Sequence, residues 1–283
     1  MNNTNNVRTW LITGVSSGFG RALAEIVLAR GDTVIGTLRR PDQVDDFEAL
    51  APGRVFTCIV DMTDRERLGS TITSAIEQAG GVDVVVNNAG YGLAGAAEEL
   101  SDDEIRHQME TNFFGLVTVT QAALPFMRAQ GAGHFINISS LAGFSGVPGM
   151  SIYSASKFSV EGFSEGLAAE AAHLGIRVTV VEPGQFRTNW SSPSAIIKAK
   201  RVIEDYRPTA GQVREGVTAV DGVQPGDPVR AAQAIIRVVE SPDPPMHLPL
   251  GADAVEYLRN KLNTWSDELA AWESVSLSTA FEE

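Results

Sequence analysis

The chain has 283 residues, of which 43% are hydrophobic and 20% charged, and its formal net charge at pH 7 is −13. This composition is typical of a globular protein, and the length suits one α/β domain with a large core. The acidic balance argues against a nucleic-acid or membrane-surface partner, because either would require a basic surface. No stretch resembles a signal-peptide core or a membrane span, so we expect a cytoplasmic protein.

Short apolar runs alternate along the chain with longer amphipathic stretches. Most of the runs are rich in Val and Ile without polar alternation, as expected of parallel strands that are covered on both faces. The single cysteine, Cys58, lies in one such run and is interpreted as a small buried hydrophobic residue. The expected strands are residues 9–13, 33–38, 55–60, 82–87, 134–139, 177–182 and 246–250.

Between these strands lie patterns typical of helices. Ser101 and Glu104 form a capping box that predicts the start of the helix carrying Asn112. Strands separated by helices of this length predict an α/β fold with a doubly wound parallel sheet, a Rossmann fold, with about seven strands and helices on both faces. We expect a single domain over residues 1–283, with helices at 18–30, 64–79, 101–130, 151–174 and 228–240.

In such a sheet the ligand lies beyond the carboxyl ends of the strands, where the strand order reverses. The first strand ends in TGVSSGFG, residues 13–20, whose glycines allow a tight turn and close approach of the backbone to a pyrophosphate. The spacing differs from G-x-G-x-x-G, and the stretch alone is equally consistent with a plain strand-to-helix turn.

Further motifs follow in a fixed order: NNAG at 87–90, Ser140, YSASK at 153–157 and PGxxxT at 183–188. Together with TGxxxGxG they make the sequence resemble the short-chain dehydrogenases/reductases, in their compact single-domain branch. The resemblance covers residues 8–190 and, more loosely, the part after 227. The extended branch, which includes epimerases, typically carries TGxxGxxG instead.

Tyr153 and Lys157 are four residues apart on an expected helix, so both side chains lie on one face. A phenol is a poor base at neutral pH, but a nearby ammonium and an oxidised nicotinamide would lower its pKa, so Tyr153 is the expected general acid/base. The resemblance implies that Lys157 binds the nicotinamide ribose, that Ser140 rather than Ser139 polarises the substrate, and that Asn112 holds a relay water. The alternatives are a packed helix tyrosine, a solvated lysine and a helix-bending asparagine.

The second strand ends in Leu38, where NAD-preferring relatives often carry aspartate, and Arg39 follows. An arginine there can bind a 2′-phosphate, with help from the Ser17 hydroxyl, while Arg40 helps or is merely solvated. NADP is therefore the preferred cofactor, with NAD possible, and no metal site is expected.

The resemblance places the adenine at Asp61 and Met62, the adenosine ribose beside Asn88, Ala89 and Gly90, and the nicotinamide near Pro183, Gly184 and Thr188. Asp61 could instead cap the next helix, a role that Thr63 or Asp64 fits better. The full expected cofactor set is Gly14, Ser16, Ser17, Gly18, Phe19, Gly20, Arg39, Asp61, Met62, Asn88, Ala89, Gly90, Tyr153, Lys157, Pro183, Gly184 and Thr188.

Residues 189–226 correspond to the family's substrate lid. The basic cluster KAKR at 198–201 is interpreted as a solvated helix face or as a contact with an anionic substrate or the cofactor phosphate. Apolar residues suggest an apolar small-molecule carbonyl or alcohol as substrate: Trp190, Ile196, Ile197 and Tyr206 in the lid, and Gly92, Leu93, Ala94, Phe144, Val147 and Met150 outside it.

The C-terminal extension, 251–283, lacks the TGxxxxVDGG-like strand of many relatives and resembles the subgroup of hydroxysteroid and retinol dehydrogenases. We expect a homo-oligomer, with a dimer favoured and a tetramer possible, through the helices near 101–130 and 151–174. The expected function is an NADP-dependent oxidoreductase that interconverts a carbonyl and an alcohol by hydride transfer. The alternative is a catalytically silent NADP-binding redox sensor.

Overall fold

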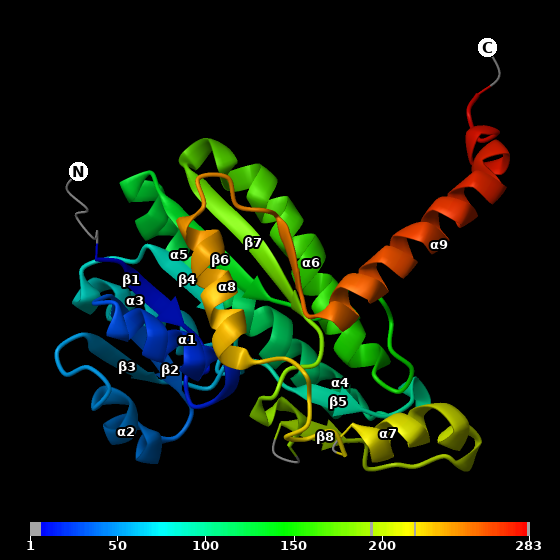
Figure 1. Ribbon diagram of the computed structural model, residues 1–283, viewed down its shortest axis with the longest axis horizontal. Coiled ribbons are helices and arrows are strands. Elements are labelled where there is room, and N and C mark those ends of the chain that lie inside the picture. The colour runs from blue at the N-terminus through cyan, green and yellow to red at the C-terminus, as the bar shows by residue number, and fades with distance from the viewer. Residues whose placement is uncertain (1–6, 193–194, 218, 282–283) are drawn as a thin grey trace.

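Seven parallel strands form the central sheet of the computed structural model, which describes residues 7–192, 195–217 and 219–281 (Figure 1). Their order across the sheet is β3-β2-β1-β4-β6-β7-β9. The order reverses between β1 and β4, and this is where a doubly wound sheet opens its ligand crevice. The strands are β1 Thr9–Ile12, β2 Thr33–Leu38, β3 Val55–Ile59, β4 Val84–Asn87, β6 Gly133–Ile138, β7 Ile176–Pro183 and β9 His247–Leu250.

Helices cover both faces of this sheet, as predicted. On one face α1 (Gly18–Ala29) and α8 (Pro228–Glu240) pack over Trp10, Ile12 and Val34. On the other face α3 (Leu68–Ala79), α5 (Gly115–Gln130) and α6 (Ser151–Ala171) pack over strand residues of opposite parity. The Val- and Ile-rich strands are therefore buried on both sides, which is why they lack polar alternation. Cys58 is buried in β3, and burial raises the pKa of its thiol to about 11.

Two of the observed helices differ from the predicted ones in where they begin or in how they are divided. The third begins at Leu68 rather than at residue 64, because residues 61–67 form turns in which Asp64 accepts from the Arg67 amide. The predicted helix 101–130 is one helical run in three parts: α4 (Asp102–Met109), a π-helical turn (Glu110–Phe114) and α5. The Ser101–Glu104 capping box begins this run as expected.

Several short elements are not predicted from the sequence. Strand β5 (Gly92–Ala94) pairs in parallel with β8 (Ile196–Lys198) in a separate two-stranded sheet. Helix α2 (Val44–Glu48) follows a 3₁₀ turn after β2, and α7 (Gln212–Gly216) lies in the expected lid. Each is too short for a periodic pattern to emerge above its surroundings.

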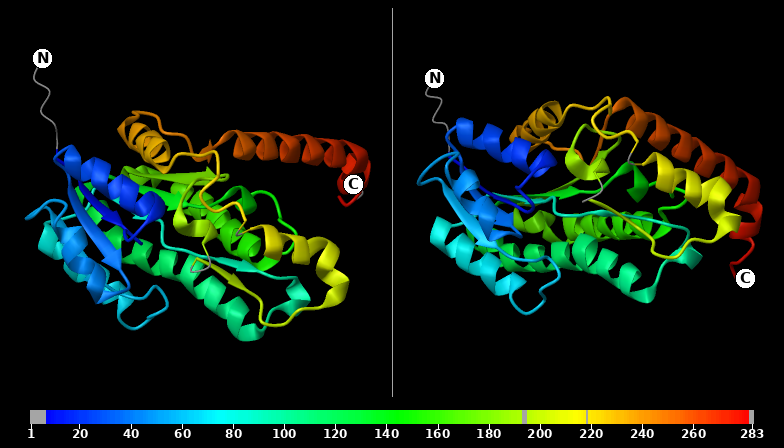
Figure 2. Two further views of the ribbon diagram at one scale, coloured as in Figure 1. Left: turned by 60° about the horizontal axis from the view of Figure 1, so that its bottom comes forward. Right: turned by 90° about the horizontal axis from the view of Figure 1, so that it is seen from below.

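The C-terminal extension is a single long helix, α9 (Ala252–Leu277). It begins beside β9 and then leads away from the sheet layers (Figures 1 and 2). Among the described helices, none combines the length and the apolar content needed to cross a membrane.

Candidate active site

The glycine-rich turn joins β1 to α1 at the crevice. Gly14 and Gly18 adopt φ values of 73° and 59°, which favour glycine. A Cβ at Gly20 would collide with the Gly14 carbonyl and lie 2.6 Å from the Asn88 amide nitrogen. Within the described part of the chain, no side chain caps α1 and no acidic residue lies in its first turn, so its N-terminal amides suit a phosphate.

The segment after β4 is tied to this turn. The Asn88 side chain donates to the carbonyl oxygens of Thr13 and Gly14, at 2.8 and 3.1 Å. The Asn88 and Ala89 amides both donate to the Thr13 hydroxyl at 2.9 Å. Asn88 therefore ties the segment after β4 to the glycine-rich turn after β1.

Tyr153 and Lys157 lie on one face of α6 and are both buried, at 4% and 6% exposed. The Lys157 ammonium lies 5.9 Å from the centre of the Tyr153 ring and donates to the Ile138 carbonyl at 2.8 Å. The Tyr153 hydroxyl shares a hydrogen bond with Ser140, whose Oγ also accepts from the Ala142 amide at 3.2 Å. The structure therefore brings Ser140, Tyr153 and Lys157 together at the carboxyl end of β6.

Burial dominates the protonation of both groups in the chain alone. It raises the pKa of Tyr153 to about 12, against the opposing effect of the Ser140 hydrogen bond. It lowers the pKa of Lys157 to about 8, against the negative charge of Glu161. The lowered phenol pKa expected from the sequence is therefore not produced by the chain itself, because the ammonium is directed at Ile138 and burial outweighs its charge. A bound oxidised nicotinamide would have to supply the missing positive charge.

Asn112 occupies the π-helical turn, a local distortion that often marks functional sites. Its amide nitrogen donates to the Tyr91 carbonyl at 3.0 Å and to Ser156 Oγ at 3.1 Å, and its oxygen accepts from the Tyr91 amide at 3.0 Å. A Cβ at Gly90 would lie 3.1 Å from Asn112 Oδ1 and 3.8 Å from the Lys157 nitrogen. Asn112 thus fixes the chain after β4 and reaches the neighbourhood of Lys157.

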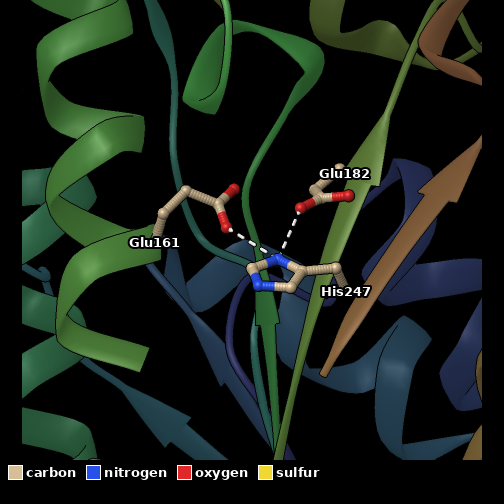
Figure 3. A group of neighbouring side chains, drawn as sticks. All are labelled: Glu161, Glu182 and His247. Carbon is tan, nitrogen blue, oxygen red and sulfur yellow. Dashed lines mark hydrogen bonds and ion pairs between the residues drawn. The ribbon is translucent and has the colours of Figure 1, made fainter. Parts of the chain in front are cut away.

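A second cluster, not found from the sequence, lies one helical turn beyond Lys157. Figure 3 shows Glu161 of α6, Glu182 of β7 and His247 of β9 pointing toward one another. The Nδ1 atom of His247 lies 2.9 Å from Glu182 Oε1 and 3.6 Å from Glu161 Oε2. Burial raises the pKa of Glu161 to about 7. In the sequence, the only sign of this cluster is that Glu161 lies four residues after Lys157 on the same helix. Glu182 and His247 come from distant strands, so the sequence does not link them to Glu161.

At the adenosine end, Leu38 is buried and Arg39 is exposed beyond it. Arg39 makes no ion pair with any described residue, whereas Arg40 pairs with Asp42 at 3.2 Å. Asp61 accepts from the Thr63 amide and hydroxyl at 2.9 and 2.8 Å. Burial opposes ionisation of Asp61, but these hydrogen bonds and the charge of Arg39 hold its pKa below the usual range.

Asp61 is not a helix cap, and neither Thr63 nor Asp64 takes the N-cap position, because α3 begins four residues after Asp64 with Arg67 at its N-cap. The neighbouring Met62 packs toward α5: a Cβ at Gly115 would lie 3.0 Å from Met62 Cβ. Asp61 is exposed, so its carboxylate remains accessible for the adenine contact that the resemblance implies.

The segment after β7 returns to the glycine-rich turn. A Cβ at Gly18 would lie 3.5 Å from Thr188 Cβ, and the rings of Phe19 and Phe186 meet edge to face at 5.1 Å. The Thr188 hydroxyl accepts from the Trp190 amide at 3.3 Å. The glycine-rich turn also carries Ser16 and Ser17, and the end of β7 carries Pro183 and Gly184. The residues expected to contact the cofactor on these two segments therefore lie at one edge of the sheet.

The lid begins directly over the tyrosine. The Trp190 and Tyr153 rings are 5.4 Å apart, and a Cβ at Gly92 would lie 2.9 Å from Trp190 Cζ2. Val147, Met150 and Val213 pack in the same cluster, which makes the surroundings of the phenol apolar. Of the other residues expected to line the pocket, Leu93 and Ala94 are buried in β5. In β8, Ile196 is buried and Ile197 is exposed. Phe144, which follows Ser140, is half-buried.

The KAKR segment faces acidic residues of the body. The Arg201 guanidinium lies 4.0 Å from a Glu98 carboxylate oxygen, and the Lys200 amide donates to Glu104 at 3.3 Å. The Tyr206 hydroxyl also donates to Glu98, at 3.0 Å. The cluster lies in and directly after strand β8, so the predicted helix face is wrong, and the cluster helps to fasten this segment to acidic residues of the body.

Comparison with known proteins agrees with this geometry. Residues 8–195 match the family model for short chain dehydrogenase. A solved short-chain dehydrogenase from Streptomyces avermitilis is similar at 43% identity and a TM-score of 0.91, over 98% of this chain and 100% of that one.

Two named relatives align over nearly the whole chain. "Oxidoreductase BOA17" of Botryotinia fuckeliana is 38% identical over 96% of this chain and 99% of its own. "3-ketodihydrosphingosine reductase" of Bacteroides thetaiotaomicron is 36% identical over 90% of this chain and 91% of its own. The chain belongs to the short-chain dehydrogenase/reductase family and is an oxidoreductase of that family.

Proposed function

We propose that the protein reduces an apolar ketone or aldehyde to the alcohol with NADPH, and catalyses the reverse reaction with NADP. The observation that carries this proposal is the convergence of Ser140, Tyr153 and Lys157 beside the glycine-rich turn. When bound, the dinucleotide supplies or accepts the hydride.

The protein's own groups handle the proton. Tyr153 is neutral in the free chain, which is the form required to donate a proton to a carbonyl oxygen as that oxygen gains negative charge. Ser140 donates to the same oxygen and orients the carbonyl, and Lys157 stabilises the phenolate left after transfer. Asn112, held by the Tyr91 backbone, positions the segment beside Lys157 through which the proton is replaced.

The proposed preference for NADP over NAD rests on the residues expected to contact the adenosine half of the cofactor. Arg39 is exposed and unpaired among the described residues, and Leu38 offers no carboxylate to repel a phosphate. Ser17 stands at the N-cap of α1, where its hydroxyl makes no capping hydrogen bond within the described chain and is available as a donor. These features support a 2′-phosphate site.

The substrate class rests on the surroundings of the phenol. Trp190, Val147, Met150 and Val213 present aromatic and aliphatic surface there, which favours an apolar group next to the carbonyl. A relative at 36% identity is named as the reductase of a keto compound, which supports the reductive direction.

The test is a panel of ketones and aldehydes with NADPH or NADH, and of the matching alcohols with the oxidised cofactors, followed by absorbance of the reduced cofactor. Turnover of apolar carbonyls with NADPH preferred over NADH is expected. A protein that binds NADPH with high affinity but turns over no member of the panel would instead favour the redox-sensor function.

A further inference from the structure

Helix α9 has little contact with the rest of the protein beyond its first turns. Ala254 is fully buried, and Asp253 accepts from the Gln185 amide at 2.7 Å, which fastens the start of the helix. From Leu262 to Phe281 every residue is exposed. Figures 1 and 2 show this part of α9 extending clear of the sheet and its covering helices.

The exposed part carries a regular apolar stripe. Val255, Leu258, Leu262, Trp265, Leu269 and Trp272 follow one another at alternating spacings of three and four residues. If the same spacing is continued beyond Val255 and Trp272, it reaches Gly251 and Ser276, which are not apolar side chains. The stripe therefore ends near the two ends of the helix. The last four of its apolar side chains are 55%, 51%, 64% and 65% exposed. This is the spacing of a coiled-coil seam, which needs a second helix to bury it.

The charges on α9 argue against a membrane surface as the partner. Helices that lie on membranes carry Lys and Arg on their polar face. Here the acidic residues Asp253, Glu256, Asp267, Glu268 and Glu273 outnumber the basic residues Arg259 and Lys261.

We propose that α9 pairs with α9 of a second copy of this chain as an antiparallel, two-fold symmetric coiled coil. In this register Val255 lies opposite the partner's Trp272, Leu258 opposite the partner's Leu269, and Leu262 opposite the partner's Trp265. Every apolar position of the stripe then has an apolar counterpart, and each contact occurs twice, as a two-fold axis requires.

Charge complementarity selects this direction. In the antiparallel pair, Lys261 flanks the seam beside the partner's Glu268, so two opposite-charge pairs form. The Lys261 ammonium already lies 4.8 Å from the centre of the Trp265 ring, which places it at the edge of the stripe. A parallel pair would instead set Glu268 beside the partner's Glu273, a like-charge contact that opposes association.

The first turns of α9 leave open space at the corresponding place. A hollow of about 690 Å³ beside the first turns of α9 is lined by Gly251, Ala252, Val255, Glu256, Arg259 and Asn260. In the antiparallel register this is where the partner's Trp272 meets Val255. A large aromatic ring thus meets a hollow whose lining includes an aliphatic side chain.

The experiment compares the full-length protein with two variants of equal added charge by size-exclusion chromatography with light scattering. Leu269→Asp places a carboxylate in the seam, and Ser274→Asp places one on the outer face of α9. We expect Leu269→Asp to halve the mass of the assembly and Ser274→Asp to leave it unchanged. Because residue 269 is exposed, circular dichroism should show both variants folded. A monomeric wild type, or a Leu269→Asp protein of unchanged mass, overturns the proposal.

Charge exchange tests the direction of the pair. Lys261→Glu and Glu268→Lys should each weaken association by roughly tenfold, and the double exchange should restore most of it. Tighter association of Glu268→Lys alone would indicate a parallel pair and overturn the register. Sedimentation of the wild type with phosphatidylcholine–phosphatidylglycerol vesicles, abolished by Leu269→Asp, would identify a membrane as the partner and overturn the proposal as well.

Discussion

The Lys157 ammonium donates to the carbonyl oxygen of Ile138, the last residue of β6, at 2.8 Å. This hydrogen bond fixes the cation at the carboxyl edge of the sheet, two residues from Ser140 in the chain. The helix α6 therefore places Tyr153 and Lys157 at the carboxyl ends of the strands. The position of Lys157 is thus set by the sheet as much as by its own helix.

Replacing Tyr153 by Phe should abolish most turnover while leaving NADPH binding intact. The substitution removes only the ionisable oxygen, and loss of a positioned acid/base costs about 10²- to 10⁴-fold in kcat. The measurements are steady-state kinetics and fluorescence titration with NADPH. Tyr257→Phe, which removes a hydroxyl from exposed α9, is the matched control and should behave as wild type. Undiminished turnover of Tyr153→Phe would refute the assignment.

Replacing Arg39 by Asp should raise the KM for NADPH by about 10- to 100-fold, because a phosphate-guanidinium contact becomes a repulsion. The KM for NADH should change far less, since NADH lacks the 2′-phosphate. Arg40→Asp makes the same charge change one residue away, at a side chain already paired with Asp42. Equal effects of the two substitutions, or an unchanged NADPH-to-NADH ratio at Arg39→Asp, would contradict a specific contact.

Glu161 should help Lys157 to retain its proton. Burial lowers the pKa of Lys157 to about 8, and the Glu161 charge opposes that effect. Glu161→Gln removes the negative charge, so the ammonium should lose its proton at lower pH and the alkaline limb of kcat/KM should move to lower pH. Glu165→Gln, four residues further along α6 with a mostly exposed carboxylate, is the control. Superimposable profiles for wild type and Glu161→Gln would show that Glu161 acts only in packing.

His134 should make the protein less stable in acid. It is 4% exposed in β6, and burial lowers the pKa of its ring to about 4. The unfolded chain takes up the proton near pH 6.5 and the folded chain only near pH 4. The stabilisation is thus present above pH 6.5 and lost as the pH falls toward 4, with a total of about 3 kcal/mol in the free energy of unfolding.

The check is denaturant unfolding of wild type and His134→Gln at neutral and acidic pH. Glutamine keeps a hydrogen-bonding group near Thr179, whose hydroxyl lies 3.0 Å from His134 Nε2, but cannot titrate. The variant should lose less stability than wild type on acidification, whereas His173→Gln on the surface should follow wild type. Equal losses in wild type and His134→Gln would exclude this histidine as the cause.

Much of the fold is predictable because its signals are local. Each strand of the main sheet contains its own apolar run, so the predicted and observed bounds agree within two residues. The glycine-rich turn and the Tyr153–Lys157 pair are likewise set by spacing within one turn or one helix. The predicted start of α3 at residue 64 is wrong. Asp64 suits a helix cap, but it instead stabilises a turn that precedes α3.

The C-terminal helix shows the limit of such signals. Its alternating spacing of apolar residues is present in the sequence, yet the segment is predicted only as an extension. Whether an amphipathic helix packs on its own body depends on where the chain emerges and what surface it meets. Only the tertiary structure shows that α9 leaves the body after its first turns.

The sequence by itself determined the order of strands and helices, the glycine-rich turn and the Tyr153–Lys157 pair on one helix face, since backbone periodicity and short spacings encode all of them. The tertiary structure alone decided that Trp190 covers Tyr153, that β5 pairs with β8, and that His247 meets Glu161 and Glu182. These contacts join residues dozens of positions apart, and their geometry depends on how whole elements pack. Burial, which moves the pKa values of Tyr153, Lys157 and Glu161, also arises only from that packing.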